Sequence, residues 1–253
     1  MKRITLLIFA AFLTKGMFAQ NVKGKTGTVT DYDSNTYKTI KIGKQWWMAE
    51  NLKVTHYDDG TAIPLVTSDT AWASLGDNST DKAYCYQNNN ANGEKDTYGA
   101  LYTWAAAMNG ANSSEADPSG VQGVCPTGWH LPSDKEWKQL EMYLGMSKNE
   151  SEGLRFRGTN QGSKLAGNAS LWAGVGLKRD PEFGSSGFSA LPGGSRMDTD
   201  GKFIGLHYMA DWWTTSWGGS SDAVNRNLHT YRTTVYSYYH SKSRGHSVRC
   251  VKD

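Results

Sequence analysis

Apolar and polar residues alternate near the start of the chain, and this alternation predicts a β-hairpin over residues 27–43. Tyr37 and Ile42 lie in its second arm. Residues 31–35 between the two arms read Asp-Tyr-Asp-Ser-Asn, a composition typical of a turn. An aromatic-rich segment follows over residues 45–52, and we expect it in the core.

Helical spacing of apolar residues appears in two later segments. The first predicts a helix capped by Thr97 that continues to Met108, where Asn-Gly ends it. The second begins with the capping box at residues 133–136 and ends at Gly145. A similar box at residues 147–150 predicts a third, shorter helix.

The late part of the chain, from residue 187 onward, reads as strands separated by turns. We expect strands near residues 188–191, 202–206, 212–216, 226–231 and 247–251. Because helices and strands occupy separate parts of the sequence, the order predicts an α+β fold with antiparallel sheets rather than alternating βαβ units.

The chain begins with Met-Lys-Arg and an apolar run at residues 4–13, the pattern of a signal peptide. We expect residues 1–19 to be this signal, cleaved after Ala19, and residues 20–253 to form one domain. The alternative is a buried N-terminal helix. The apolar run is shorter than the roughly 20 residues that span a bilayer, and no second long run occurs. The sequence therefore predicts a secreted, periplasmic or cell-surface protein without a membrane span.

Composition narrows the classes of function. Ten Trp and 13 Tyr stand beside a hydrophobic content of only 38%, so we expect large rings to fill much of the core. The 27 basic residues include Lys2, Arg3 and Lys15 of the predicted signal, and the remaining 24 balance the 24 acidic residues. Nucleic-acid binding normally requires a basic excess, so we exclude it. Arg196, Arg226 and Arg249 lie beside core-like segments, and we expect them to make buried structural bonds.

Three cysteines, Cys85, Cys125 and Cys250, occur in the chain. Disulfides persist in the oxidising compartments that exported proteins reach. We favour a Cys125–Cys250 bond, because Cys250 lies in a strand-like ending and Cys125 opens a well-marked segment. Sequence alone does not fix a pairing among three, and the alternative of three reduced core cysteines stays open.

Several ordered segments resemble the Fibrobacter succinogenes major paralogous domain family. The matching runs are residues 42–52 (IGKQWWMAENL), 98–104 (YGALYTW), 125–133 (CPTGWHLPS) with Trp137, 187–194 (GFSALPGG), Trp212 with Trp213, and 247–253 (SVRCVKD). The resemblance implies an exported or surface protein of Bacteroidetes or Fibrobacteres. It also implies a C-type-lectin-like fold, shared with formylglycine-generating enzymes, with two to three helices, small antiparallel sheets, long loops and adjacent terminal strands. No activity follows from it.

Metal sites have little support in the sequence. Asp31, Asp33 and Asn35 have the spacing that opens an EF-hand loop, but Thr36 and Ile42 replace the required Gly and Glu, which favours a hairpin turn. The six histidines show no metal-binding spacing. We therefore predict no metal and no cofactor, and expect His130 to hydrogen-bond the backbone of its turn.

Catalytic motifs are equally lacking. The sequence contains no Gly-x-Ser-x-Gly elbow and no P-loop, which favours a protein that is not an enzyme. A formylglycine-generating type of enzyme, one alternative, acts through a pair of reactive cysteines near the C-terminus. Here only Cys250 lies there.

Aromatic residues in the late loops are the best positive indication of function. Rings stack on the apolar face of sugars and favour interfaces. Tyr236, Tyr238 and Tyr239 cannot all point inward from one strand. We expect a binding module for glycan or another cell-surface polymer; the alternative is a structural or protein-interaction module of a surface assembly. The candidate ligand-binding residues are Trp213, Trp217, Tyr231, Tyr236, Tyr238, Tyr239 and His240.

Overall fold

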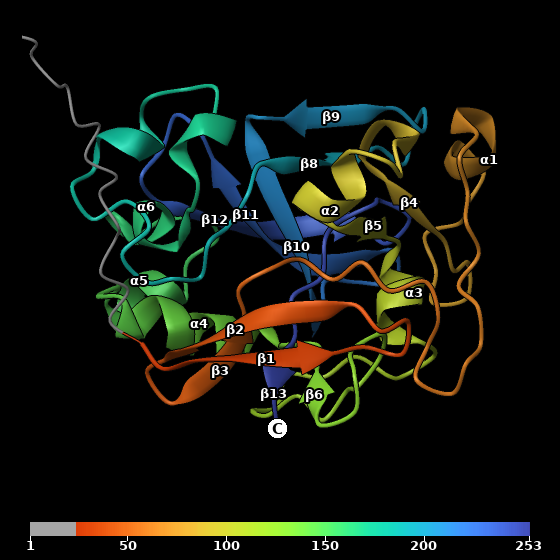
Figure 1. Cartoon of the computed structure of the whole chain (residues 1–253), viewed down its shortest axis with the longest axis horizontal. Coiled ribbons are helices and arrows are strands. Elements are labelled where there is room, and N and C mark those ends of the chain that lie inside the picture. Colours follow the sequence, from red (N-terminus) through yellow and green to blue (C-terminus); the bar gives the residue numbers. More distant parts are fainter. Residues whose placement is uncertain (1–23) are drawn as a thin grey trace, which may run out of the picture.

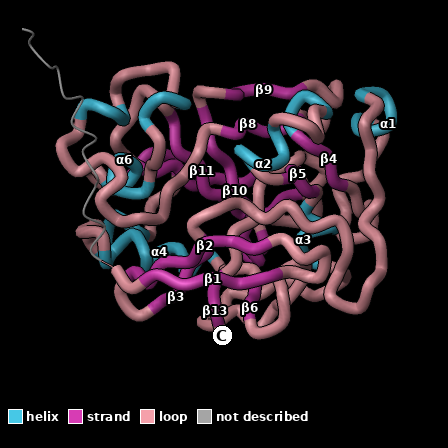
Figure 2. Tube along the Cα trace, in the orientation of Figure 1, coloured by secondary structure: helices cyan, strands magenta, loops and turns pink. Residues whose placement is uncertain are grey.

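The computed structural model describes residues 24–253 of the 253-residue chain. The predicted signal peptide, residues 1–19, lies outside the described residues. Long loops connect the helices and strands, as Figure 2 shows in pink. None of the helices formed in the described part of the chain has the length and apolar character needed to cross a bilayer.

The predicted hairpin starts the first sheet. Strands β1 (Thr26–Thr30) and β2 (Thr36–Ile42) pair antiparallel, and β3 (Gln45–Met48) continues the sheet. Strand β13 (Val251–Lys252) lies between β3 and β6 (Trp129–His130), which gives the order β1-β2-β3-β13-β6. The last strand of the chain therefore lies beside the early ones, as the family resemblance implies (Figure 1).

The second sheet has six strands in the order β7-β12-β11-β10-β8-β9. Their bounds are β7 Arg155–Arg157, β8 Gly193–Arg196, β9 Phe203–Leu206, β10 Met209–Trp217, β11 Asp222–His229 and β12 Val235–Ser241. Strands β10, β11 and β12 form a continuous antiparallel unit, and β8 joins β10 in parallel. Figure 1 shows this sheet mainly in blue, next to the red and orange strands of the first.

A two-stranded sheet and short helices complete the described residues. The small sheet pairs β4 (Tyr84–Tyr86) with β5 (Ala100–Tyr102). The α-helices are α1 Asp69–Ala73, α2 Glu94–Tyr98, α3 Trp104–Met108, α4 Asp134–Tyr143, α5 Lys148–Ser151 and α6 Gln161–Leu165. Three 3₁₀ turns are η1 Gln87–Asn89, η2 Ala169–Leu171 and η3 Leu177–Arg179. The fold is α+β, built mainly of strands.

The structure confirms both helices that were predicted from capping boxes. The Ser133 hydroxyl accepts from the Glu136 backbone, and the Glu136 carboxylate accepts from the Ser133 backbone at 2.9 Å, at the start of α4. Ser147 and Glu150 make the same reciprocal pair at the start of α5. These local signals fix where the helices begin.

The single helix predicted from Thr97 to Met108 is wrong. Gly99 interrupts it with a φ of 76°, and a Cβ there would lie 2.7 Å from the Leu52 carbonyl oxygen. Only glycine combines this close approach with that conformation. The chain then forms β5, and Thr103 caps the separate helix α3 by accepting from the Ala106 backbone.

The strand predictions of the late region are confirmed in part. Strands β9, β10 and β11 cover most of the predicted segments at residues 202–206, 212–216 and 226–231. The prediction at residues 188–191 is wrong, because the carbonyl oxygens of Phe188 and Ser189 accept from the Arg249 guanidinium instead of a neighbouring strand. The tyrosine-rich stretch, expected as turns, contains β12.

Aromatic rings join the two large sheets through α4. Trp47 of β3 lies 4.9 Å from Trp137 of α4, and Trp137 lies 5.7 Å from Trp212 of β10, centroid to centroid. The expectation of a ring-rich core is confirmed. The fully buried tryptophans are Trp47, Trp72, Trp104, Trp137, Trp172, Trp212 and Trp213.

Buried polar groups tie distant segments together. Arg196, Arg226 and Arg249 are buried, as expected, and each makes several hydrogen bonds. The expectation for His130 is wrong: its ring nitrogens contact carboxylate oxygens of Glu136 and Asp253, each at 2.6 Å, rather than the backbone.

The disulfide prediction is confirmed. Cys125 and Cys250 are bonded, with their Cα atoms 5.9 Å apart and a sequence separation of 125. The bond fixes the segment before β6 to the segment before β13. Cys85 is a buried free thiol, and burial raises its pKa to about 12.

Candidate functional site

The two faces of the six-stranded sheet carry different side chains. Cross-strand partners share a face, so Trp212 and Arg226, which are paired in register, lie on one side. Asp211 and Asn227, also paired, lie on the other side, together with Tyr236 opposite Asn227. We call the first the helix-covered face and the second the open face.

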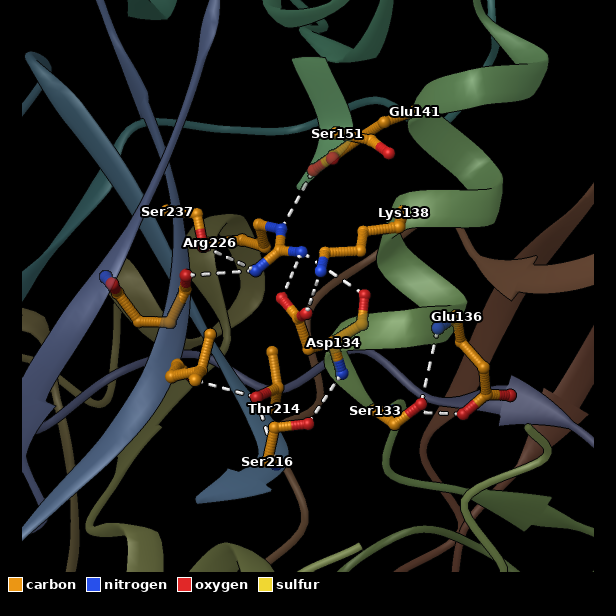
Figure 3. A network of polar contacts seen from close by, with 12 residues as sticks. Ser133, Asp134, Glu136, Lys138, Glu141, Ser151, Thr214, Ser216, Arg226 and Ser237 are labelled. Atoms are coloured by element: carbon orange, nitrogen blue, oxygen red, sulfur yellow. Dashed lines mark hydrogen bonds and ion pairs between the residues drawn. The ribbon is translucent and has the colours of Figure 1, made fainter. Parts of the chain in front are cut away.

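Helix α4 lies on the helix-covered face and pairs with its charges (Figure 3). The Arg226 guanidinium contacts Glu141 at 2.8 Å and Asp134 at 2.6 Å, and donates to the Ser237 hydroxyl at 2.8 Å. Arg157 contacts the other oxygen of Glu141 at 2.6 Å. Both oxygens of the fully buried Glu141 are therefore paired. The ion pairs on this face join α4 to strands β11 and β7 of the sheet.

A cavity of about 300 Å³ lies on the open face. Phe156 and Ile204 line it and are 45% and 36% exposed, whereas Asp211 and Asn227 line it but are buried. Tyr236 packs against Phe156 with ring centroids 4.8 Å apart. The cavity thus has an apolar and aromatic rim around a polar floor, the composition typical of ligand sites.

Asp211 is the central group of the floor. One carboxylate oxygen accepts from the amides of Asn225 at 3.1 Å and Asn227 at 3.0 Å. The other oxygen, Oδ2, is buried and has no hydrogen-bond partner. Burial raises the pKa of Asp211 to about 7, against the lowering effect of the two amides and of the Arg244 charge. Burying an acceptor without a hydrogen-bond partner costs free energy, so a ligand that donates a hydrogen bond to this oxygen would be stabilised.

Two histidines lie next to this carboxylate. His240 Nδ1 and His246 Nε2 are 3.0 Å apart, and one nitrogen from each ring lies within 4.8 Å of an Asp211 oxygen. His246 is fully buried against the Trp213 ring, at 4.3 Å between centroids, and its Nδ1 has no partner. Burial, reinforced by the nearby Arg244 charge, lowers the pKa of His240 to about 4.

Arg244 also lines the cavity, but its charge is balanced locally. Its Nε donates to an Asp198 carboxylate oxygen at 3.1 Å, and both side chains are partly buried. The Arg244 charge is therefore compensated by Asp198, whereas Asp211, with its pKa raised to about 7, is partly ionised near neutral pH.

Comparison with known proteins places the chain in a family. Residues 40–252 match the model of the Fibrobacter succinogenes major domain. The chain belongs to this family. No match was found among curated proteins, and none among solved structures. The family domain includes the whole of the cavity, the disulfide and every strand of the six-stranded sheet.

The predicted site residues divide within the family domain. Tyr236 and His240 line the cavity, and Tyr238 lies on the same face of β12, opposite Asn225. Tyr239 lies on the opposite face and is 37% exposed.

The remaining three predicted residues are not part of the cavity lining. Trp217 and Tyr231 are exposed, at the end of β10 and after β11 respectively. Trp213 is a correction: its ring is fully buried and its indole donates to the Tyr102 carbonyl, so it presents no surface to a ligand.

Sequence reasoning missed the polar floor of the family domain. Asp211, Asn225, Asn227 and His246 were not singled out, because they lie on two different strands and a later loop and meet only in the folded sheet. One signal was available: Asp211 directly precedes two core tryptophans, Trp212 and Trp213. Burying a carboxylate beside core residues is costly, so its presence there indicates either a pairing partner or a functional role.

Proposed function

We propose that this protein is an exported, non-catalytic binding module that holds a neutral sugar unit of a glycan in the open-face cavity. The observation that carries the proposal is the buried Asp211 oxygen without a partner, at the floor of a cavity with an exposed aromatic rim. A sugar hydroxyl that donates to this oxygen would satisfy it.

The rim suits the other side of a sugar ring. Phe156 and Tyr236 lie with their planes tilted by 58°, and Phe156 is 45% exposed. Such rings offer apolar area for the C–H face of a pyranose, while Asn227 on the floor can exchange hydrogen bonds with hydroxyls. A polar floor with an aromatic wall therefore favours a polyhydroxylated ligand over a purely apolar one.

A neutral sugar unit is favoured over an anionic one by the local charge balance. The Arg244 charge is paired with Asp198, and the pKa of Asp211 lies at about 7. An anionic ligand would meet no uncompensated positive charge in the cavity and would lose its hydration on entry.

Export and the C-type-lectin-like architecture are part of the same proposal. The Cys125–Cys250 disulfide is consistent with an oxidising compartment, and the adjacent early and late strands agree with that fold type. The formylglycine-generating alternative has weaker support, because Cys250 is committed to the disulfide and the Cys85 thiol is buried. A nucleophilic cysteine is normally an accessible thiolate.

A glycan array followed by calorimetry in EDTA tests the proposal. We expect saturable one-to-one binding, weakened at least about tenfold by Tyr236→Ala and by Asp211→Asn, which replaces the unpartnered acceptor with a donor. Tyr239→Ala, on the opposite face of the same strand, is the matched control and should bind as the wild type does. Absence of any glycan ligand, or binding that is lost only with Tyr239→Ala, would reject the cavity as the binding site.

A further inference from the structure

The histidine pair at the floor of the cavity is not needed by the sugar-binding proposal. His240 and His246 come from β12 and from the loop before β13, and both approach Asp211 of β10. Among residues 24–253, this is the only group of three His, Cys, Asp or Glu side chains whose ligand atoms come so close together.

We propose that Asp211, His240 and His246 bind a divalent transition-metal ion of the Zn²⁺ type at the floor of the open-face cavity. The inference goes beyond sugar binding and does not depend on it. Because a sugar hydroxyl and the ion would both use Oδ2 of Asp211, the two ligands would compete for that oxygen.

Distances support a shared ion. The facing nitrogens of His240 and His246 are 3.0 Å apart. Two imidazoles on one Zn²⁺, with bonds of about 2.0–2.1 Å and angles between roughly 90° and 110°, place their nitrogens about 3 Å apart. The Asp211 ligand atom lies within 4.8 Å of both rings, so a side-chain adjustment of this carboxylate completes the set.

The surroundings of Asp211 orient it as a ligand. Asn225 and Asn227 both donate to Oδ1, so the buried Oδ2, which has no partner, is the oxygen available to an ion. Hydrogen bonds of this kind to a ligating carboxylate are typical of the outer shell of metal sites. His246, packed against Trp213, is likewise fixed.

The donor set selects the class of ion. Two imidazoles with one carboxylate suit Zn²⁺ and its first-row neighbours, whereas Ca²⁺ and Mg²⁺ prefer oxygen ligands throughout. Three protein ligands leave at least one position of a four-coordinate ion for water or for a donor atom from the cavity. Arg244 does not exclude a cation, because its guanidinium is paired with Asp198.

A simple hydrogen bond between the two histidines is the competing explanation. It requires one proton between the rings and leaves both Asp211 Oδ2 and His246 Nδ1 buried without partners. A bound ion would engage Oδ2, so it accounts for one feature that the hydrogen bond does not.

Metal titration decides between a bound ion and a simple hydrogen bond between the two histidines. The protein, produced without a polyhistidine tag and stripped with EDTA, is titrated with Zn²⁺ by calorimetry and with Co²⁺ by visible absorption. We expect one ion per chain, a rise in Tm with Zn²⁺, and no displacement by excess Ca²⁺. His240→Ala and His246→Gln should weaken binding at least about 100-fold, because even the loss of an outer-shell partner costs about 10–100-fold.

The controls separate this site from adventitious binding and from the sugar proposal. His56→Ala removes a histidine that contacts Asp33 at 2.7 Å elsewhere on the surface, and should bind Zn²⁺ as the wild type does. Circular dichroism checks that His246→Gln is folded, and the partly exposed His240 provides a second variant. Equal affinity of the wild type and His240→Ala, or no saturable one-to-one binding, would overturn the metal site. Sugar binding in EDTA would survive either result.

Discussion

The two faces of the six-stranded sheet contain similar chemistry but use it in opposite ways. On the helix-covered face, Glu141 is fully buried and both of its oxygens are paired with guanidinium groups. On the open face, Asp211 is equally buried, yet one of its oxygens has no partner and its pKa is raised to about 7. The hydrogen-bonding capacity of Glu141 is met within the protein, whereas Asp211 has one acceptor oxygen left for a ligand.

The difference indicates where the fold gives up stability. A paired carboxylate such as Glu141 offsets the cost of its own burial, whereas an unpaired one such as Asp211 does not. Sites that hold such groups are retained where binding needs them. The comparison is not perfect, because Arg157 on the helix-covered face keeps two nitrogens without partners. Its third nitrogen nevertheless contacts Glu141.

The largest effect should come from breaking the helix-covered face. Glu141→Leu removes the carboxylate partner of the buried Arg157 and one of the two carboxylates that pair with the buried Arg226, which keeps Asp134. We expect a loss of about 3–5 kcal/mol in the free energy of unfolding, measured by urea denaturation.

Glu152→Gln is the matched control for that variant. Glu152 is 58% exposed and contacts Lys138, so its replacement should cost less than about 1 kcal/mol. Similar losses for Glu141→Leu and Glu152→Gln would mean that burial of the charge cluster does not matter, and the contrast between the faces would fail.

On the open face, the corresponding change should have the opposite sign. Asp211→Asn keeps the acceptor for Asn225 and Asn227 but removes a charge whose burial is poorly compensated. We expect a gain of about 1–3 kcal/mol in unfolding free energy at pH 8, where the wild-type carboxyl is ionised. The gain should shrink as the pH falls below about 7, since the native Asp211 then takes up a proton. A destabilised variant at pH 8 would show that the charge of Asp211 supports the fold.

His130 of β6, which contacts Glu136 of α4, makes the stability of the protein depend on pH. Burial disfavours the protonated ring, but hydrogen bonds and charges of Glu136 and Asp253 outweigh burial and raise the pKa of His130. The stabilisation from the charged ring is therefore complete below its unfolded pKa of about 6.5, and is lost as the pH rises through the raised folded value.

His130→Gln should cost about 1–2 kcal/mol at pH 5 and progressively less at alkaline pH. The check is the difference in unfolding free energy between wild type and variant across this range. A difference that grows with pH would have the wrong sign and would contradict the assignment of a protonated His130 between two carboxylates.

Local signals explain which parts of the fold were predictable. The capping residues Ser133 and Ser147 lie within three residues of their partners, so sequence alone locates the starts of α4 and α5. The same reasoning failed at Gly99, because its close approach to the Leu52 carbonyl is a tertiary contact that no local pattern reveals.

The candidate site was predictable only in part, for a related reason. The stretch around Tyr236 and His240 was noticed for its aromatic content, but it was expected to form turns rather than an inner strand of the sheet. Asp211, Asn225 and His246 become neighbours through cross-strand register and through a loop that returns after β12. Register depends on pairing across the whole sheet, which a single sequence does not specify.

The smallest expected effect separates two tryptophans of the same strand. Trp213 is fully buried and Trp217 is 58% exposed, although sequence reasoning treated them alike. Removing a fully buried ring costs about 3–5 kcal/mol, whereas Trp217→Ala should lower the unfolding free energy by less than about 1 kcal/mol. Urea denaturation measures the stability, and calorimetry of the same variant should leave glycan affinity unchanged, since Trp217 does not line the cavity. A large loss of affinity in Trp217→Ala would shift the binding surface from the open face to the end of β10, because the polar floor would then not be the part that the ligand contacts.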